Sequence, residues 1–299
     1  IATSKNDVSY QIASIYYNLY ATKQTKKIIE ANIELLNNQK TDANNYVKQG
    51  VILENEVLKI DLAISNLETN LSDIENTILF FKNNLSILTG LNTTIDIPEE
   101  LPSNPVQELS LDNAVSNALK NRSEIKGLSV REEQATIAKK ITNSNYLPTL
   151  SGIGSYNYDQ PNMRVFPNQE TFTGTWYAGV SLNWNLTDLF TNKNKIKESK
   201  FSIDKVNTSI NQVKEGIQIE VNADYNNFQL AKQKIEIAKK AVTQATENFR
   251  VEQNKFNANN TTATDFLNAN ALLVNAKINL TTAISNADLA YKKLLKSIN

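Results

Sequence analysis

Three acidic side chains, Glu54, Glu56 and Asp265, stand at two turns of the chain and are the residues best placed for chemistry. If several copies assemble around an axis, these carboxylates could form a ring that attracts cations or pairs with a basic partner. Acids at a helix start also offset its exposed N–H groups, so ordinary helix-start or solvated charges are an equally good interpretation. Glu56 and Asp265 occupy matching places in an internal repeat, which favours the helix-start role.

The remaining residues give no support for catalysis. The 299 residues contain no His and no Cys, which removes disulfides, thiolates, the commonest metal ligand and the commonest general base. Glu132 and Glu133 are adjacent on a predicted helix and do not face a common point. The 31 basic and 31 acidic residues balance, so no nucleic-acid footprint is expected. We therefore expect no enzyme activity, no cofactor and no metal site.

One of the two turns is unusually apolar. Val51, Ile52 and Leu53 follow one another there, where exposure to water is normally unfavourable. A docking surface for a partner is our preferred interpretation, and burial by a neighbouring helix is the alternative.

Long helices must position these turns. Only 8 Gly and 6 Pro occur in the chain, which is typical of long uninterrupted elements. A helix predicted from about Leu189 to Phe256 has an apolar period of seven, interrupted by a four-residue stutter near Ile217 to Val221 that should change the packing. Another helix carries nine apolar positions at spacings of four and three, the pattern of a left-handed coiled-coil seam. These nine are Ile60, Ile64, Leu67, Leu71, Ile74, Ile78, Phe81, Leu85 and Leu88.

The chain consists of two copies of one unit. A shift of 209 places superposes Gly50 on Asn259 and Glu56 on Asp265, and it carries the nine-position seam onto a stripe of smaller residues between Ala269 and Ser297. The first copy begins partway down its long helix, so we expect roughly 90 to 110 residues before the first residue of this sequence. One chain would then supply four strands. Because a membrane-spanning barrel needs at least about eight strands, several chains must build it together.

The stretch from Tyr146 to Leu186 is the only long segment with a period of two, and it predicts a β-hairpin around a loop with Pro161 and Pro167. The apolar positions of its second arm cover roughly 26 Å at about 3.3 Å per residue, close to the apolar band of an outer-membrane barrel. Tryptophan, which favours the membrane–water boundary, stands at both ends. A hairpin packed on a soluble core is the alternative. The predicted lipid-facing residues are Trp176, Ala178, Val180, Leu182 and Trp184.

No apolar run approaches the 18 or so residues of a spanning helix, so we expect any membrane contact to involve strands. Helix breakers divide the chain into five segments. They are a first-repeat helical hairpin (1–88), a connector with a short helix (89–122), a lead helix (123–145), the β-hairpin (146–188), and the long and return helices of the second repeat (189–299).

Eight stretches occur in an order and spacing that are more specific together than any one of them alone. They are IYYNLYATKQ, GVILENEVL, NNLSILTG, NALKNRSEIKG, YLPTLSGIGSYNY, TWYAGVSLNWNL, ADYNNFQLA and TTATDFLNANALLVNAKINL. Through these stretches the chain resembles the TolC family of outer-membrane factors, and the resemblance covers essentially the whole sequence. Ser123 and Asn185 stand where the family often has proline, and Asn259 stands where glycine is common.

The resemblance implies a mainly α fold with a β-hairpin. Long coiled-coil helices would form a trimeric α-helical barrel, continued by a β-barrel with up to four strands per chain. The implied role is a passive exit duct of a tripartite efflux pump or type I secretion system, in the outer membrane of a Gram-negative bacterium with a large periplasmic part. A periplasmic coiled-coil adaptor or scaffold is the alternative.

The resemblance also implies partners and a docking site. The chain would form a homotrimer in outer-membrane lipid and work with a periplasmic adaptor (membrane fusion) protein and an inner-membrane transporter. Its two helical turns would form the periplasmic tip, where the duct docks and is gated. The implied tip residues are Gly50, Val51, Ile52, Leu53, Glu54, Glu56, Asn259, Thr261, Thr262 and Asp265.

Overall fold

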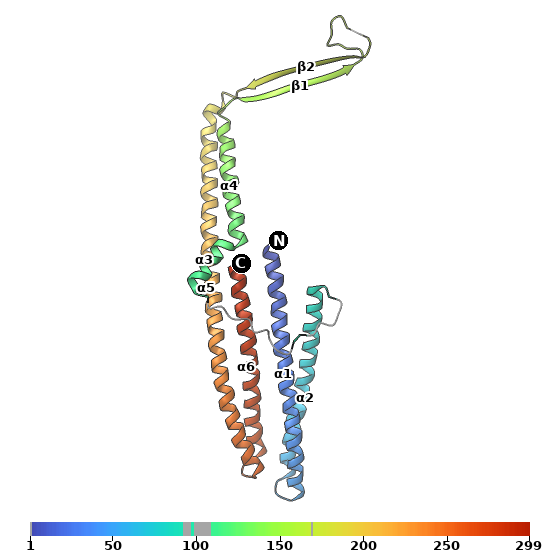
Figure 1. The fold of residues 1–299 in the computed structure, drawn as a ribbon, viewed down its shortest axis with the longest axis vertical. Helices are drawn as coiled ribbons and strands as arrows, with labels where there is room; N and C mark the ends of the chain where they lie inside the picture. The colour runs from blue at the N-terminus through green and yellow to red at the C-terminus, as the bar shows by residue number, and fades with distance from the viewer. Residues whose placement is uncertain (1, 92–96, 99–108, 169) are drawn as a thin grey trace. The chain divides into compact units, whose positions relative to one another are not determined.

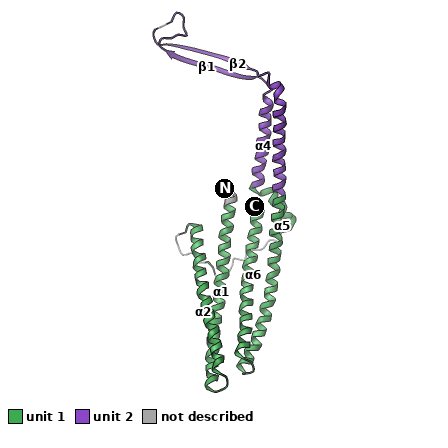
Figure 2. Cartoon of the chain, turned by 180° about the vertical axis from the view of Figure 1, so that it is seen from behind, with its two compact units in different colours: residues 1–123, 215–299 green, residues 124–214 purple. Residues whose placement is uncertain are grey.

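The computed structural model describes residues 2–91, 97–98, 109–168 and 170–299, so most of the predicted connector before residue 109 lies outside the described residues. The chain forms two compact units (Figure 2). Unit 1 contains residues 1–123 and 215–299, and unit 2 contains residues 124–214.

Unit 1 is built from long helices that run side by side (Figure 1). Helix α1 (Ala2–Lys48) turns into α2 (Glu54–Thr89), and the second part of α5 (Asp188–Asn257) turns into α6 (Ala263–Ile298). The short helix α3 (Leu111–Asn121) packs against α6. Helix α6 also packs against α1, so the two repeats share one interface within the chain.

The predicted seams form the interior of unit 1. In α2 eight of the nine seam positions are buried or half-buried, and only Leu88, in the last turn, is exposed. All nine equivalent positions of α6 are buried or half-buried. The period of four and three therefore predicted the inward face of both return helices, because residues at that spacing lie on one side of a helix.

Unit 2 contains helix α4 (Ser123–Ser144, from residue 124 onward), the first part of α5, and a two-stranded antiparallel sheet. Asn192 of α5 donates its side-chain N–H to the Thr142 carbonyl of α4 over 2.8 Å, which fixes the register of these two helices. Strand β1 (Thr149–Asp159) pairs with β2 (Thr173–Asn183), with Gly152 opposite Val180. The strand ends at Asn183, so Trp184, predicted to be a strand residue, lies just beyond it.

The mainly α fold with one β-hairpin is confirmed. The helices can be long because their sequences contain no Pro and only two Gly, and the hairpin forms where apolar and polar residues alternate. None of the described helices has an apolar stretch long enough to cross a membrane.

Candidate functional site

The two turns of unit 1 have the same backbone conformation. Gly50, with φ of 72°, and Asn259, with φ of 56°, both adopt the left-handed conformation that ends a helix. In both turns the next backbone N–H donates to a carbonyl five residues earlier. Val51 donates to the Tyr46 carbonyl over 2.9 Å, and Asn260 donates to the Lys255 carbonyl over 2.8 Å. Asparagine tolerates this conformation better than most residues, so Asn259 can replace a glycine.

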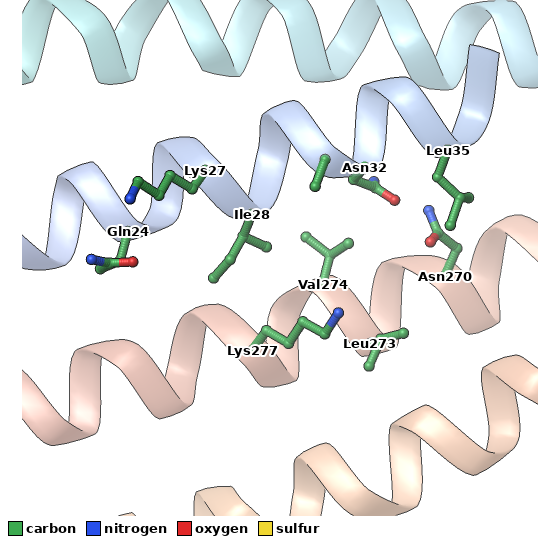
Figure 3. A pocket seen from close by; sticks show the side chains of 10 residues that line it. Gln24, Lys27, Ile28, Asn32, Leu35, Asn270, Leu273, Val274 and Lys277 are labelled. Atoms are coloured by element: carbon green, nitrogen blue, oxygen red, sulfur yellow. The ribbon is translucent and has the colours of Figure 1, made fainter. Parts of the chain in front are cut away.

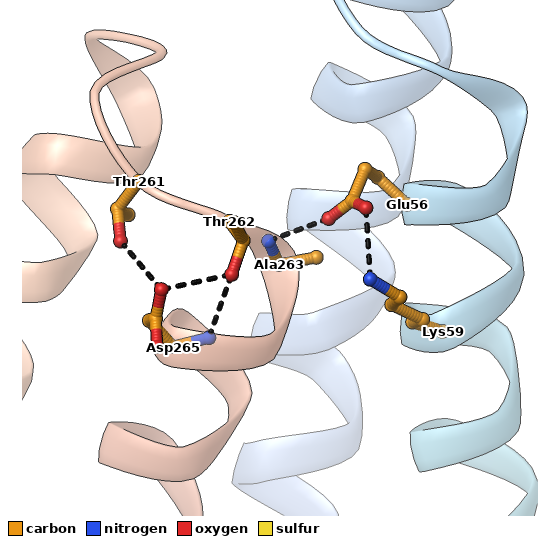
Figure 4. A network of polar contacts seen from close by, with 6 residues as sticks. All are labelled: Glu56, Lys59, Thr261, Thr262, Ala263 and Asp265. Atoms are coloured by element: carbon orange, nitrogen blue, oxygen red, sulfur yellow. Dashed lines mark hydrogen bonds and ion pairs between the residues drawn. The ribbon is translucent and has the colours of Figure 1, made fainter.

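Thr262 and Asp265 stabilise the start of α6. The Thr262 hydroxyl caps the helix by accepting the Asp265 N–H over 3.2 Å, and it donates to the Asp265 carboxylate over 2.8 Å (Figure 4). Thr261 donates to the same carboxylate over 3.2 Å. These hydroxyl hydrogen bonds lower the pKa of Asp265. Asp265 therefore has the predicted helix-start role.

Glu56 joins the two repeats. Its carboxylate accepts the Ala263 backbone N–H, at the start of α6, over 2.7 Å and the Lys59 ammonium over 2.9 Å (Figure 4). The Lys59 hydrogen bond is the main cause of the lowered pKa of Glu56, and the Ala263 hydrogen bond adds to it against partial burial. Glu56 therefore caps the helix of the other repeat, which differs from the expected role at its own helix.

The reason for this difference lies at the start of α2. Leu53 occupies the cap position there and has no side-chain acceptor.

Two side chains of α1 strengthen the connection between the repeats. Gln39 donates to the side-chain oxygen of Asn257 over 3.0 Å, and the Tyr46 hydroxyl donates to the Asn257 carbonyl over 3.4 Å. These two contacts were not predicted from the sequence. The available signal was Gln39, a polar residue at a buried position between Leu36 and Ala43.

An aromatic cluster lies directly behind the turns. Phe266 of α6 is fully buried and stacks on Phe256 of α5, with ring centroids 5.1 Å apart. The ring of Phe249 also contacts the ring of Phe266, with centroids 5.7 Å apart. The tip of the second repeat is therefore held by apolar packing as well as by its caps.

The predicted docking residues differ in exposure. Val51 is 48% exposed and Leu53 is 75% exposed, whereas Ile52 is half-buried and packs against the core. Glu54 and Asn259 are exposed, and Thr261 is half-buried. The structure thus leaves Val51, Leu53 and Glu54 accessible to a partner and takes Ile52 away from that surface.

The hairpin exposes one complete apolar face. Trp176 is 76% exposed and Val180 is 75% exposed, and Leu182 is similar. Cross-strand partners share a face of a sheet, so Tyr156 opposite Trp176 and Leu150 opposite Leu182 extend this surface onto β1. Ala178 lies on the same face, opposite Gly154, and the Trp184 ring is half-exposed beyond the strand.

The tip and the hairpin face offer surfaces for binding, but their described residues are not arranged for catalysis. In the described ranges, no three acidic side chains gather closely enough to hold a metal ion. Glu56 and Asp265 accept hydrogen bonds from ammonium, backbone N–H and hydroxyl donors, which favours the ionised forms of these two carboxylates.

Solved structures share this fold. The outer-membrane channel OprN aligns with a TM-score of 0.80 and 15% identity, over 99% of this chain and 66% of its own. The outer membrane protein VceC from Vibrio cholerae aligns with a TM-score of 0.78 and 18% identity, over 98% of this chain and 70% of its own. CusC aligns with a TM-score of 0.83 and 11% identity, over 99% of this chain and 69% of its own. The chain therefore spans about two thirds of these proteins. A comparison with curated proteins gives no significant match.

The matching structures and the family are channels rather than enzymes. They confirm the predicted location in a Gram-negative outer membrane with a periplasmic helical part. Residues 114–299, more than half of the sequence, match the family described as outer membrane efflux protein. The chain therefore belongs to the outer membrane efflux protein family, as its resemblance to the TolC-type factors predicted.

Proposed function

We propose that this chain is the passive exit duct of a tripartite efflux pump or type I secretion system. It works as a homotrimer, its two turns dock a periplasmic adaptor protein, and an inner-membrane transporter supplies the energy. One observation carries the proposal: the turns of both repeats lie together at one end of unit 1, joined by Glu56, with Val51 and Leu53 exposed beside them.

The tip offers two kinds of contact to an adaptor. Val51 and Leu53 provide exposed apolar area, which gains free energy when a partner covers it. Glu54, exposed at the first turn of α2, provides a negative charge for a basic partner residue. Such a combination of an apolar centre with a charged edge is usual in protein interfaces.

The tip also offers a gate. Opening a duct at its tip requires the turns of the two repeats to separate. The contact of Glu56 with Ala263 holds them together, beside the contacts of Gln39 and Tyr46 with Asn257. An ionised carboxylate on a helix N-terminus is a stronger acceptor than a neutral group. We infer that an adaptor shifts the tip towards opening by competing for this contact.

The adaptor or scaffold alternative is less favoured. Residues 114–299 match a family of outer-membrane efflux proteins, and the hairpin keeps its apolar face exposed. A small β domain in a soluble adaptor would pack that face on its own core.

Docking is tested with the intact protein in detergent and the periplasmic adaptor encoded nearest to its gene. Replacing both Val51 and Leu53 with Asp should weaken adaptor binding strongly without changing the oligomeric state. Val130→Asp is the matched control, because Val130 is a similarly exposed apolar residue on α4, and it should bind like the native protein. Unchanged binding by the tip variant, or equal loss in the control, would contradict docking at these turns.

A further inference from the structure

A cavity of about 310 Å³ lies between α1 and α6, where the two repeats meet (Figure 3). Apolar and polar side chains from both helices line it. The apolar ones are Ile28, Ala31, Leu35, Leu273 and Val274, and the polar ones are Gln24, Lys27, Asn32, Asn270 and Lys277. Sites for small molecules start at about 300 Å³ and combine an apolar wall with a few polar groups. The size and lining of this cavity are therefore those of a small-molecule site.

Two asparagines in the wall of the cavity are buried. Asn32 is 7% exposed and Asn270 is 4% exposed. In the part of the chain that the structure describes, neither side-chain amide forms a hydrogen bond with another residue. Buried polar groups are nearly always paired, because an unpaired one is unfavourable. Both amides can therefore bind a polar group of a molecule that enters the cavity.

Lysine gives the cavity a positive edge. Lys27 and Lys277 are exposed residues that line it, one from α1 and one from α6, so they stand at its opening (Figure 3). Among the described lining residues there is no Asp or Glu. An ammonium group attracts an anion and donates strong hydrogen bonds to it. The charge of the lining therefore favours an anionic ligand.

The internal repeat indicates that helix packing does not require these lysines. The shift of 209 places relates Lys277 to Glu68 of α2 and Lys27 to Glu236 of α5. Both equivalent residues are exposed and carry the opposite charge. The positive charge is thus specific to the cavity between α1 and α6 and is not a property of the repeated unit.

A second cavity in unit 1 provides a comparison within the chain. It measures about 300 Å³ and shares Asn32, Asn270 and Val274 with the first cavity. Its other described lining residues are all uncharged: Ile29, Leu36, Ala63, Asn66, Leu67, Asn70, Leu267, Ala271, Asn275 and Ile278. The two cavities have nearly the same volume and share the two buried amides, but only the first has lysines.

We propose that the cavity bordered by Lys27 and Lys277 binds a small organic anion with an apolar body, of the class of aryl carboxylates. Lys277 and the side-chain amides of Asn32 and Asn270 donate hydrogen bonds to the carboxylate. Apolar lining residues such as Ile28 and Leu273 cover the ring. Because the ligand contacts both α1 and α6, its binding stabilises the interface between the two repeats.

Photolabelling of the intact polypeptide in lipid nanodiscs tests this site. The probe is para-benzoylbenzoate, an aryl carboxylate that attaches to nearby C–H groups on irradiation. Mass spectrometry of the peptides should find the label on α1 between residues 24 and 35 and on α6 between residues 270 and 277. Labelling should saturate with probe concentration and should be displaced by naphthoate, which is not photoreactive.

Variants of Lys277 test the charge. Lys277→Gln should reduce labelling about tenfold or more, because it removes a charged hydrogen-bond donor, whereas Lys277→Arg should keep it. Lys240→Gln is the matched control, since Lys240 is an exposed lysine on α5 away from the cavity, and it should label like the native protein. The uncharged probe para-benzoylbenzamide should label the native cavity weakly.

Three results would overturn the proposal. Equal labelling by the uncharged amide would show that charge does not select the ligand. Label on α2 between residues 63 and 70 would place the probe in the second cavity. Unchanged labelling of Lys277→Gln, or label spread evenly over the helices, would exclude an anion site at this position.

Discussion

Unit 1 and the hairpin of unit 2 present apolar residues in opposite ways. In unit 1 the inward residues Ile60, Phe266 and Leu294 are completely buried by neighbouring helices. In the hairpin Trp176, Val180 and Leu182 are as regularly spaced, yet all three are exposed. The helices thus supply their own core, whereas the apolar face of the hairpin stays exposed to its surroundings.

The difference shows which apolar surfaces a single chain can bury by itself. A helical pair buries one stripe per helix when it folds, because the partner is joined by a short turn. A two-stranded sheet has two faces and no second layer, and an isolated hairpin is marginally stable in water. Something outside the hairpin must therefore cover this apolar face. We propose that lipid and neighbouring strands do so in the outer membrane, the location that the family indicates.

The strongest effect should come from removing a buried side chain in unit 1. Phe266→Ala removes a fully buried ring between Phe249 and Phe256 and should destabilise the α5–α6 tip by about 3 to 5 kcal/mol. Hydrogen exchange of the α5 and α6 amides measures the loss. Val57, its equivalent in the first repeat, is smaller, so Val57→Ala should cost about 1 to 3 kcal/mol. Equal losses would show that the two tips are packed alike.

Charging the exposed face should affect membrane assembly instead. Val180→Arg places a cation on the apolar face and should cost about 2 to 4 kcal/mol in the bilayer, which blocks insertion. Ser181→Arg is the control on the opposite face of the same strand and should assemble. Membrane fractionation measures the insertion of both variants, and the change in their gel mobility on heating measures their assembly. Normal insertion of Val180→Arg would contradict the lipid-facing assignment.

A smaller effect is expected at the caps. Thr262→Ala removes the side-chain acceptor at the start of α6 and should destabilise that helix end by about 0.5 to 2 kcal/mol. The first-turn amides of α6 should then exchange faster. Leu53→Ser adds an acceptor at the equivalent position, where none exists, and should slow exchange at the start of α2. No change in either variant would mean that tertiary contacts alone fix these ends.

The smallest effect concerns Glu56 at neutral pH. Its lowered pKa means that the carboxylate stabilises the folded tip fully above the ordinary glutamate pKa, and that this contribution is lost as the pH falls through the lowered value. Glu56→Gln should cost at most about 1 kcal/mol, because an amide oxygen still accepts the Ala263 N–H. Exchange at Ala263 should respond to acid in the native protein. The same acid response in Glu56→Gln would assign it to another group.

The sequence predicts the elements well because their signals are local. Spacings of four and three reveal the seams of α2 and α6, and alternation reveals β2. The contact between Glu56 and Ala263 was not predictable, since it depends on how closely two turns approach that are separated by 207 residues in the chain. The half-burial of Ile52 has the same origin: its neighbours come from the core that both repeats build.

This chain belongs to a family of outer-membrane efflux proteins, and we propose that its hairpin faces lipid in a trimeric channel. Fractionation of the intact polypeptide is the decisive experiment. We expect the protein to sediment with the outer membrane, to require detergent for extraction, and to run as a trimer once extracted. A protein that stays in solution without detergent and runs as a monomer would show that the hairpin does not face lipid and that the chain does not form such a channel.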